Sequence, residues 1–493
     1  MRFKKHSPFK TINIVLLAVL SLLTFSCSND DDINLPVPTA DDVVVQNFIW
    51  RAMNYWYFWQ GDVQNLADDR FISNESYTEF LQAFPNPEDL IEELLFTEDR
   101  FTFYSDDYVE LLNSLSGITK SNGLQFFIVD LTEDSTDNLF GFVRNVVPGS
   151  DADVKGLERG NVFWGVNGIT LTPDNYIDLL FGDADTYTLN MGDLDVANSL
   201  VVPNVEEVSL TKFENLQEHP IRVAKTLDVN GQKIGYLMYQ RFNSGFNEAL
   251  NDAFAQFVVD GVTDLVVDLR YNPGGSVNTT RLLASMIYGT KTDELFLRQR
   301  WNEKRQSNFS TSQLEDYFAN STGVTPINTL NLNKVYILAT GRSASASELL
   351  INGLDPYVEV IHIGDVTTGK NEFSISLVDI PENNYQYSPS TENQINPENS
   401  WIIQPLVGRN ENADGFFDYT SGFVPDIELK EDFFHLGVLG DPNEPLLARA
   451  LEEITGVSSK SSKSYQTLKA GDFKVYETPV REIMFLDKPL NLQ

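Results

Sequence analysis

The residues most suited to chemistry are a cluster of serines and, further along the chain, one lysine. The run GRSASASE (341–348) directly follows the apolar stretch KVYILAT, so its serines open a predicted helix. The first N–H groups of a helix lack partners and carry the positive end of the helix dipole, which suits an oxyanion. After that helix and the predicted strand VEVIHIGD comes TTGK, which ends at Lys370.

This order of elements allows a serine–lysine pair. A helix followed by a parallel strand returns the chain to the same edge of a sheet, so Ser345 and Lys370 can meet there. A buried lysine with a lowered pKa can take the proton of a serine without a histidine. None of the four histidines lies beside a serine in a nucleophile-elbow pattern, and neither G-x-S-x-G nor H-E-x-x-H occurs. A triad assembled only in three dimensions stays open, and serine-rich helix caps and loop lysines are common, so the pair needs further support.

The elements that would position this pair begin at about residue 205. Apolar strands alternate with helices, as in TDLVVDLRYNPGG, a buried strand that ends in a Gly-rich turn, and TTRLLASMIYG, the helix after it. Continuous apolar strands that alternate with helices are typical of an α/β layer with parallel strand pairs. We therefore predict an α/β core over residues 205–457.

Two units of different pattern precede the core. Residues 43–117 place apolar side chains at three- and four-residue spacings, which predicts a helical domain. Its dense aromatics, from Trp50 to Trp59, are expected to pack against a neighbouring domain rather than to stack on a ligand. Residues 118–200 read as short strands separated by turns, which predicts a β-rich domain. Residues 458–493 are polar and then mixed, and their role is not predicted.

Three separated motifs together resemble one family. SASASE, TTGK and DLRYNPGG are similar to segments of the C-terminal processing (tail-specific) peptidases. The resemblance implies a ClpP/crotonase-like core, Ser345 as nucleophile and Lys370 as general base. It also implies that Glu348 orients the lysine and that an oxyanion hole is formed by backbone N–H groups, namely those of Ala346, Gly274 and Gly275. Ser374 stands where many members carry a glutamine that binds the lysine, so other groups must position it. The resemblance covers about residues 45–455 and includes stretches similar to members from Bacteroidetes.

The β-rich unit resembles a PDZ domain inserted before the core. GLQF is similar to a PDZ carboxylate-binding loop, whose N–H groups hold the C-terminal carboxylate of a peptide while the peptide adds a strand to the sheet. GLERGNVFWGVNG is similar to a later PDZ segment, with Asn161 in place of the usual Asp. The resemblance therefore implies a peptide-binding site at residues Gly123, Leu124, Gln125 and Phe126. It also implies that this domain captures substrate C-termini or gates the cleft.

The start of the chain reads as a targeting signal. Basic residues precede an apolar run, TINIVLLAVLSLLTF, which at about 15 residues is the length of a signal-peptide core and too short to span a bilayer. The run ends at Cys27, and LLTFSC resembles a bacterial lipoprotein signal (1–27) in which that cysteine is lipidated. Residues 28–42 read as an acidic, Pro-containing tether. We expect a lipid-anchored protein of the cell envelope of a Gram-negative bacterium; a plain secretory signal is the alternative.

Composition narrows the classes of partner. The chain has 493 residues, with 35 Lys+Arg against 71 Asp+Glu and a formal charge of −36, which repels nucleic acid. One cysteine excludes a disulfide framework and any multi-cysteine metal site. We expect polypeptide substrates, no metal and no organic cofactor; the sequence does not predict an oligomeric state. Two alternatives remain, a binding protein of the same fold that cleaves nothing and an envelope scaffold with a vestigial protease core.

Overall fold

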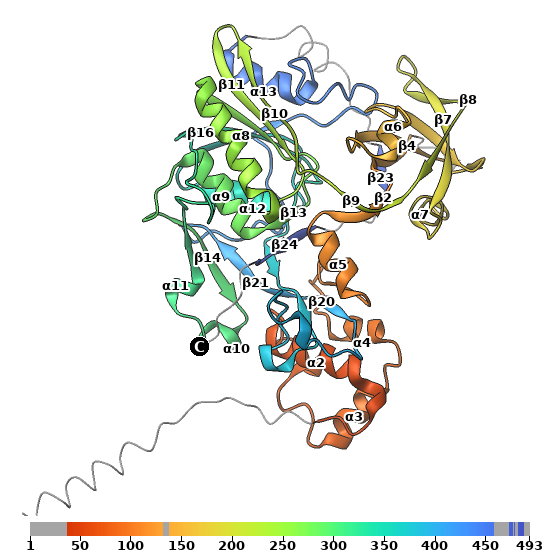
Figure 1. Cartoon of the computed structure of the whole chain (residues 1–493), viewed down its shortest axis with the longest axis vertical. Coiled ribbons are helices and arrows are strands. Elements are labelled where there is room, and N and C mark those ends of the chain that lie inside the picture. The colour runs from red at the N-terminus through yellow and green to blue at the C-terminus, as the bar shows by residue number, and fades with distance from the viewer. Residues whose placement is uncertain (1–36, 132–137, 458–472, 477, 479–481, 488–493) are drawn as a thin grey trace, which may run out of the picture.

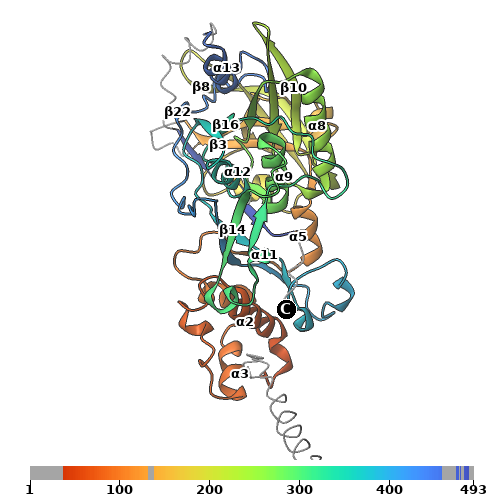
Figure 2. The same ribbon diagram turned by 90° about the vertical axis from the view of Figure 1, so that its left-hand side faces the viewer.

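The computed structural model describes residues 37–131, 138–457, 473–476, 478 and 482–487. A helical unit forms one end of the molecule, a core of two mixed sheets forms the other, and a β-rich unit lies beside the core (Figure 1). The view at right angles shows the helical unit beneath the core rather than beside it (Figure 2). Within the described ranges, no helix has both the length and the apolar character that crossing a bilayer requires.

The helical unit is held to the core by its aromatic side chains. Its helices are α2 (Val44–Trp56), α3 (Asn74–Gln82) and α4 (Pro87–Leu94), followed by β1 (Phe103–Ser105) and α5 (Tyr108–Leu115). Trp50, Trp56 and Tyr57 are completely buried. The Trp56 ring lies 5.6 Å from that of Trp301 in the core, and its Nε1 donates to the Asn384 carbonyl. The expectation of packing against a neighbouring domain is therefore confirmed for Trp56, whereas Trp50 packs inside the helical unit against Phe71 and Tyr77.

The central sheet of the core has the order β10-β11-β12-β16-β17-β22, and only its first pair, β10–β11, is antiparallel. Strands β12 and β16 are apolar and buried because helices cover both faces of the sheet. α8, α9 and α12 pack on one face, with Leu237 and Ile337 in that cluster, and α13 packs on the other with Met238 and Leu338. The bounds are β10 Ile221–Val229, β11 Gln232–Tyr239, α8 Asn247–Asp260, β12 Asp264–Asp268, α9 Val277–Tyr288, β16 Lys334–Ala339, α12 Ala346–Leu354, β17 Glu359–Gly364, β22 Ile427–Glu428 and α13 Pro445–Thr455.

A second mixed sheet joins the core to the helical unit. Its order is β13-β24-β18-β21-β14-β15, with a smaller sheet, β1-β20-β19, beneath it. Strand β24 comes from the segment 458–493, whose role the sequence left open. The bounds are β13 Gly274–Ser276, β14 Leu295–Trp301, α10 Glu303–Gln306, α11 Thr311–Leu314, β15 Glu315–Tyr317, β18 Glu372–Ser374, β19 Leu377–Val378, β20 Ile402–Gln404, β21 Leu406–Glu411 and β24 Ile483–Phe485.

The β-rich unit is a seven-stranded sheet with short helices α6 (Asp151–Val154) and α7 (Tyr176–Phe181). Its order is β23-β3-β4-β5-β7-β8, and β6 pairs with β5. A separate two-stranded pair, β2 (Ile118–Ser121) with β9 (Phe213–Gln217), brackets the unit. Strand β8 runs to residue 211, past the predicted boundary at 200. The bounds are β3 Leu124–Asp130, β4 Leu139–Val146, β5 Val162–Val166, β6 Ile169–Thr170, β7 Thr186–Asp195, β8 Leu200–Thr211 and β23 Lys474–Tyr476.

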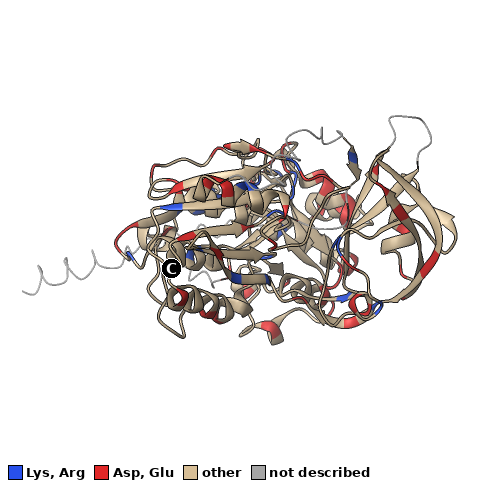
Figure 3. Ribbon diagram, turned by 90° about the horizontal axis from the view of Figure 1, so that it is seen from above, with Lys and Arg blue, Asp and Glu red and all other residues tan. Residues whose placement is uncertain are grey.

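Acidic residues are spread over the core and the β-rich unit rather than gathered on one element (Figure 3). The formal charge of −36 is therefore not carried by a single element.

Candidate active site

Ser345 lies at the start of α12 in a backbone conformation that few residues adopt. Its φ of 63° and ψ of −110° fall outside the regions favoured by residues with a side chain, at a cost of about 1–3 kcal/mol. The side chain is completely buried, and Oγ has no hydrogen-bond partner among the described residues. The next residue, Ala346, is the first residue of α12, so its N–H has no acceptor inside the helix. Strain of this kind is common at functional sites.

The Gly-rich turn passes directly over this serine. A Cβ placed on Gly274 would lie only 2.8 Å from the Ser345 Cβ and 3.1 Å from the Ala346 nitrogen. Gly274 and Gly275 have φ of 111° and 137°, so both the conformation and the close approach require glycine here. The structure therefore places two of the predicted oxyanion-hole residues, Gly274 and Ala346, beside the serine. The Gly274 N–H, however, already donates to Asn272 Oδ1 at 2.9 Å, which leaves Gly275 and Ala346 as the better-placed donors.

The serines on either side of Ser345 fasten the turn to the helix. Ser343 Oγ donates to the Leu269 carbonyl at 2.7 Å, and Ser347 Oγ donates to the Asn272 carbonyl at 2.9 Å. Both serines therefore hold the turn by these hydrogen bonds. The alternation SASAS thus places the middle serine at the turn and its two neighbours on the turn's backbone.

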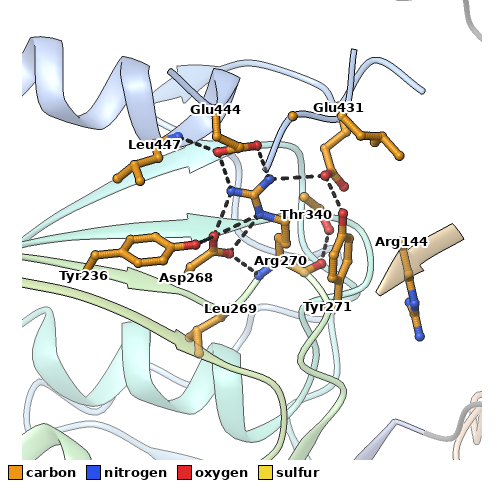
Figure 4. A network of polar contacts seen from close by, with 12 residues as sticks. Arg144, Tyr236, Asp268, Leu269, Arg270, Tyr271, Thr340, Glu431, Glu444 and Leu447 are labelled. Carbon is orange, nitrogen blue, oxygen red and sulfur yellow. Dashed lines mark hydrogen bonds and ion pairs between the residues drawn. The ribbon is translucent and has the colours of Figure 1, made fainter. Parts of the chain in front are cut away.

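A buried ion network holds the other end of the turn (Figure 4). The Arg270 guanidinium contacts Asp268 at 2.7 Å, Glu444 at 2.5 Å and Glu431 at 3.2 Å. Burial alone would lower the pKa of Arg270, but the charges of Asp268 and Glu444 outweigh it and raise the pKa well above its usual value. Tyr271 donates to Glu431. The network therefore fixes the turn through a guanidinium whose charge is fully paired.

Lys370 is the second buried cation near this turn. Its side chain has no exposed surface, and its Nζ takes part in no ion pair within the described ranges. Nζ donates to the Glu482 carbonyl at 2.7 Å and lies 4.9 Å from the centre of the Phe101 ring. Burial lowers the pKa of Lys370 to about 8, although the charges of Glu482 and Glu372 act in the opposite direction. A large fraction of Lys370 is therefore neutral near pH 8, where an exposed lysine is charged.

Glu348 connects the two candidate residues through their backbones. One carboxylate oxygen accepts from the N–H groups of Ser345 at 2.7 Å and Lys370 at 2.9 Å, and the other accepts from Thr367 and Gly369. Burial raises the pKa of Glu348, and these donors oppose that effect. The expectation that Glu348 orients the lysine needs one change, because the carboxylate holds the lysine's N–H and not its ammonium group.

The sequence did not indicate two residues of the helical unit that reach this site. Arg100 Nη2 donates to the Gly369 carbonyl, and Phe101 presents its ring to Lys370. Both lie far from the serine and lysine motifs in the sequence, and neither belongs to a pattern that predicts chemistry. The site is therefore completed by a unit that the motifs do not include.

The segment with residues 482–487, which the sequence did not place, also reaches the site. Glu482 binds Lys370, as described above, and Ser374 Oγ donates to the Met484 carbonyl at 3.2 Å. Ser374, which stands where many members of the resembled family carry a glutamine, thus contacts this segment. The apolar run IMFL (483–486) is of strand length and was the available signal.

In the predicted peptide-binding loop, two backbone N–H groups already donate to nearby side chains. The N–H groups of Gly123 and Leu124 donate to Ser121 Oγ and Asn122 Oδ1, and the Gln125 side chain donates to Glu218. Leu124, Gln125 and Phe126 line a cavity of about 410 Å³. The loop therefore offers apolar side chains to a ligand, while two of its N–H groups are already engaged. Cys27, the predicted lipidation site, lies outside the described residues.

Comparison with known proteins was consistent with this geometry. The profile described as "Peptidase family S41" matches residues 233–408, and "Peptidase S41 N-terminal domain" matches residues 44–103. The carboxyl-terminal-processing peptidase 1 of Arabidopsis thaliana chloroplasts is 25% identical over 46% of this chain and 43% of its own length. A carboxyl-terminal-processing protease of Picosynechococcus is 24% identical over 56% of this chain and 60% of its own length. The matches thus span about half the length of these curated relatives.

A solved structure agrees over more of the chain. A Bacteroides fragilis protein, crystallised as a candidate S41 protease, superposes with a TM-score of 0.65 at 27% identity, over 83% of this chain and 97% of its own. The match to residues 44–103 falls on the helical unit, and the match to residues 233–408 falls on the core. The core match contains the Gly-rich turn, Ser345 and Lys370. On this agreement of sequence, fold and site, residues 44–103 and 233–408 of the chain are similar to the two domains of peptidase family S41.

Proposed function

We propose that this chain is a serine endopeptidase that cleaves polypeptides with a dyad of Ser345 and Lys370. The observation that carries the proposal is the single Glu348 carboxylate that holds the N–H groups of both residues. This arrangement fixes the nucleophile and the buried lysine relative to each other. The lowered pKa of Lys370, about 8, supports its role as a base.

The mechanism follows from these positions. Ser345 Oγ attacks the carbonyl carbon of a peptide bond while neutral Lys370 accepts the hydroxyl proton. The N–H groups of Ala346 and Gly275 stabilise the oxyanion. Lys370 then returns the proton to the leaving amine as the C–N bond breaks, which leaves an acyl-serine. A water molecule, activated by Lys370, hydrolyses that ester and releases the second product.

The β-rich unit is proposed to bind peptides in the PDZ manner. An extended peptide would add a strand beside β3 and direct apolar side chains toward Leu124 and Phe126. Because two N–H groups of the loop are already engaged, recognition of the added strand should weigh more than recognition of a terminal carboxylate. A peptide and its amidated copy should then bind with similar affinity in calorimetry. A strong preference for the free acid would contradict this weighting.

Hydrolysis of an unfolded substrate tests the proposed activity. The purified chain should cleave β-casein, Ser345→Ala should not, and the matched control Ser390→Ala, at an exposed serine, should behave like the unmodified chain. Equal cleavage by the Ser345→Ala variant would exclude the dyad. If no preparation cleaves casein, the non-catalytic binding protein and the scaffold become the better interpretations.

We further propose attachment to the cell envelope through a lipid on Cys27. The support is the order of basic residues, short apolar run and cysteine in the first residues of the chain. Cys27→Ser should move the protein from the membrane fraction to the soluble fraction, or block its maturation. Unchanged membrane partition of the variant would point to another mode of attachment.

A further inference from the structure

The described residues 473–476, 478 and 482–487 lie along both sites that the proposed function assigns to a peptide; we call them the tail segment. Its first part, β23, pairs antiparallel with β3, with Lys474 opposite Asp130 and Tyr476 opposite Ile128. Further along, Thr478 lines the same cavity as Leu124 and Phe126. The tail segment therefore occupies the edge of β3, where a peptide would add a strand.

Its second part lies in the groove beside Ser345. Strand β24 pairs parallel with β13, with Ile483 opposite Gly274. The Ile483 N–H donates to the Pro273 carbonyl at 2.8 Å, and the Leu486 N–H donates to the Ser374 carbonyl at 3.1 Å. These hydrogen bonds are made by backbone groups, so an extended peptide of another sequence can form them as well.

The Ile483 carbonyl lies where the reactive carbonyl of a substrate is expected. Three atoms surround the point where a Cβ on Gly274 would lie. The Ile483 carbonyl oxygen is 2.1 Å from that point, the Ser345 Cβ is 2.8 Å from it and the Ala346 nitrogen is 3.1 Å from it. Carbonyl, nucleophile and oxyanion donor are therefore neighbours. The parallel register also turns the Ile483 carbonyl toward the Gly275 N–H.

The side chain of Ile483 fills an apolar pocket. It is 4% exposed and belongs to one buried cluster made of both the helical unit and the core. The other buried members are Phe103, Leu111, Leu115, Val378, Ile380 and Ile402. A pocket of this composition accepts a branched aliphatic residue and rejects a charged one.

The tail segment does not leave the dyad in a reactive state. Lys370 Nζ donates to the Glu482 carbonyl, and Ser345 Oγ has no partner among the described residues. The base is therefore engaged by the backbone of the tail segment instead of the serine hydroxyl. A peptide held in this way occupies the groove without the proton transfer that cleavage requires.

We propose that the tail segment is a built-in competitor of the substrate, which holds the β3 edge and the groove with Ile483 in the pocket for the residue before the scissile bond. The inference rests on the proposed function, because it assigns the substrate groove of that same site. It also assigns the substrate class as an extended polypeptide with a branched aliphatic residue at this position. Hydrolysis of a substrate then requires displacement of the tail segment.

A charge at residue 483 tests the competition in the full chain. Ile483→Asp would place an unpaired carboxylate in the apolar pocket, so the tail segment should leave the groove and kcat/KM for β-casein should rise by about tenfold or more. The matched control is Ile72→Asp at a side chain that is 96% exposed, which should leave kcat/KM unchanged. If Ile483→Asp does not fold, as judged by thermal melting, Ile483→Ala serves as a milder variant with an increase in the same direction. No increase in a folded variant, with activity present in the unmodified chain, overturns the proposal.

A peptide added in trans identifies the site of competition. A synthetic copy of residues 473–487 should inhibit Ile483→Asp by raising KM with kcat unchanged, and the same peptide with Asp at position 483 should not inhibit. Intact mass should show residues 484–493 in both the unmodified chain and Ser345→Ala. Their loss only where Ser345 is present would mean that the tail segment is cut as a substrate, which contradicts a held competitor.

Hydrogen exchange separates this proposal from the proposed function. The amides of Ile483 and Leu486 should exchange slowly in the unmodified chain and fast in Ile483→Asp. If no variant cleaves casein, the proposed function fails, and slow exchange still supports the position of the tail segment. Exchange as fast as in the free peptide overturns the proposal even if the enzyme is active.

Discussion

Arg270 and Lys370 are both completely buried beside the same Gly-rich turn, yet they are held in opposite ways. Arg270 contacts three carboxylates, and its pKa is raised. Lys370 contacts a carbonyl and an aromatic ring, and its pKa is lowered to about 8. Burial opposes the charge of both side chains, so direct contact with carboxylates, which Arg270 makes and Lys370 does not make within the described ranges, decides the outcome.

This difference suits Arg270 to a structural role and Lys370 to the proposed role of general base. A fully paired guanidinium keeps its charge and fixes the backbone that carries Gly274 and Gly275. A buried ammonium without an ion-pair partner gives up its proton near neutral pH, which a general base must do. The Glu348 carboxylate accepts from four backbone and hydroxyl donors rather than from the lysine Nζ.

The largest expected effect comes from substitution of Lys370. Lys370→Ala should reduce kcat by about a thousandfold or more, because the serine loses its base. Lys370→Arg should be equally inactive, since a guanidinium does not release its proton near neutral pH. The double variant Ser345→Ala/Lys370→Ala should be no worse than either single variant. Steady-state assays with casein measure kcat for the single and double variants. A strongly additive loss in the double variant would contradict the proposed dyad.

Substitution of Arg270 should affect stability instead. Arg270→Met would leave Asp268 and Glu444 buried without their cation, which should cost about 3–5 kcal/mol in the free energy of unfolding. The control is Arg300→Met, which breaks a more exposed pair with Glu411 and should cost about 1 kcal/mol or less. Urea unfolding of the two variants measures the difference. Similar losses for both would mean that the buried network is not what fixes the turn.

Much of the core could be predicted because its strands and helices have strong patterns. Continuous apolar strands such as LVVDL and KVYILA lie between helices, and the structure has them as parallel strands of one sheet. The path of residues 458–493 could not be predicted, since their described strands gain partners only in three dimensions. β23 pairs with a strand of the β-rich unit and β24 with the Gly-rich turn, both far away in the sequence.

The candidate site divides in the same way. Ser345, Ala346, Gly274 and Lys370 belong to local motifs, so the sequence could indicate them together with their expected roles. Phe101 and Glu482 contact Lys370 from segments that carry no motif, and only the packing of separate units brings them there. Two details concern hydrogen-bond partners, which residue spacing does not specify: Glu348 accepts from the backbone N–H of Lys370, and two N–H groups of the predicted carboxylate-binding loop already have acceptors.

The pH dependence of activity reports the state of Lys370. In the proposed mechanism the neutral lysine is the active form, so kcat/KM should rise with pH by about tenfold per unit below the pKa of about 8 and level off above it. A profile that is flat from mildly acidic to alkaline pH would contradict a titrating lysine.

The smallest expected effect concerns the contact between Lys370 and the aromatic ring of Phe101, the weakest contact in the comparison of Arg270 with Lys370. A ring face stabilises the charged ammonium by about 0.5–1 kcal/mol, so Phe101→Leu should keep the site apolar while removing that support. The charged form then becomes less favourable, and the pKa of Lys370 should fall further, by about half a unit. The rising limb of the pH profile should move to lower pH with the plateau of kcat/KM nearly unchanged. Phe84→Leu, in the helical unit and away from the lysine, should leave the profile in place. A shift to higher pH would mean that Phe101 acts mainly by excluding water from Lys370, and that burial rather than the ring controls the lysine.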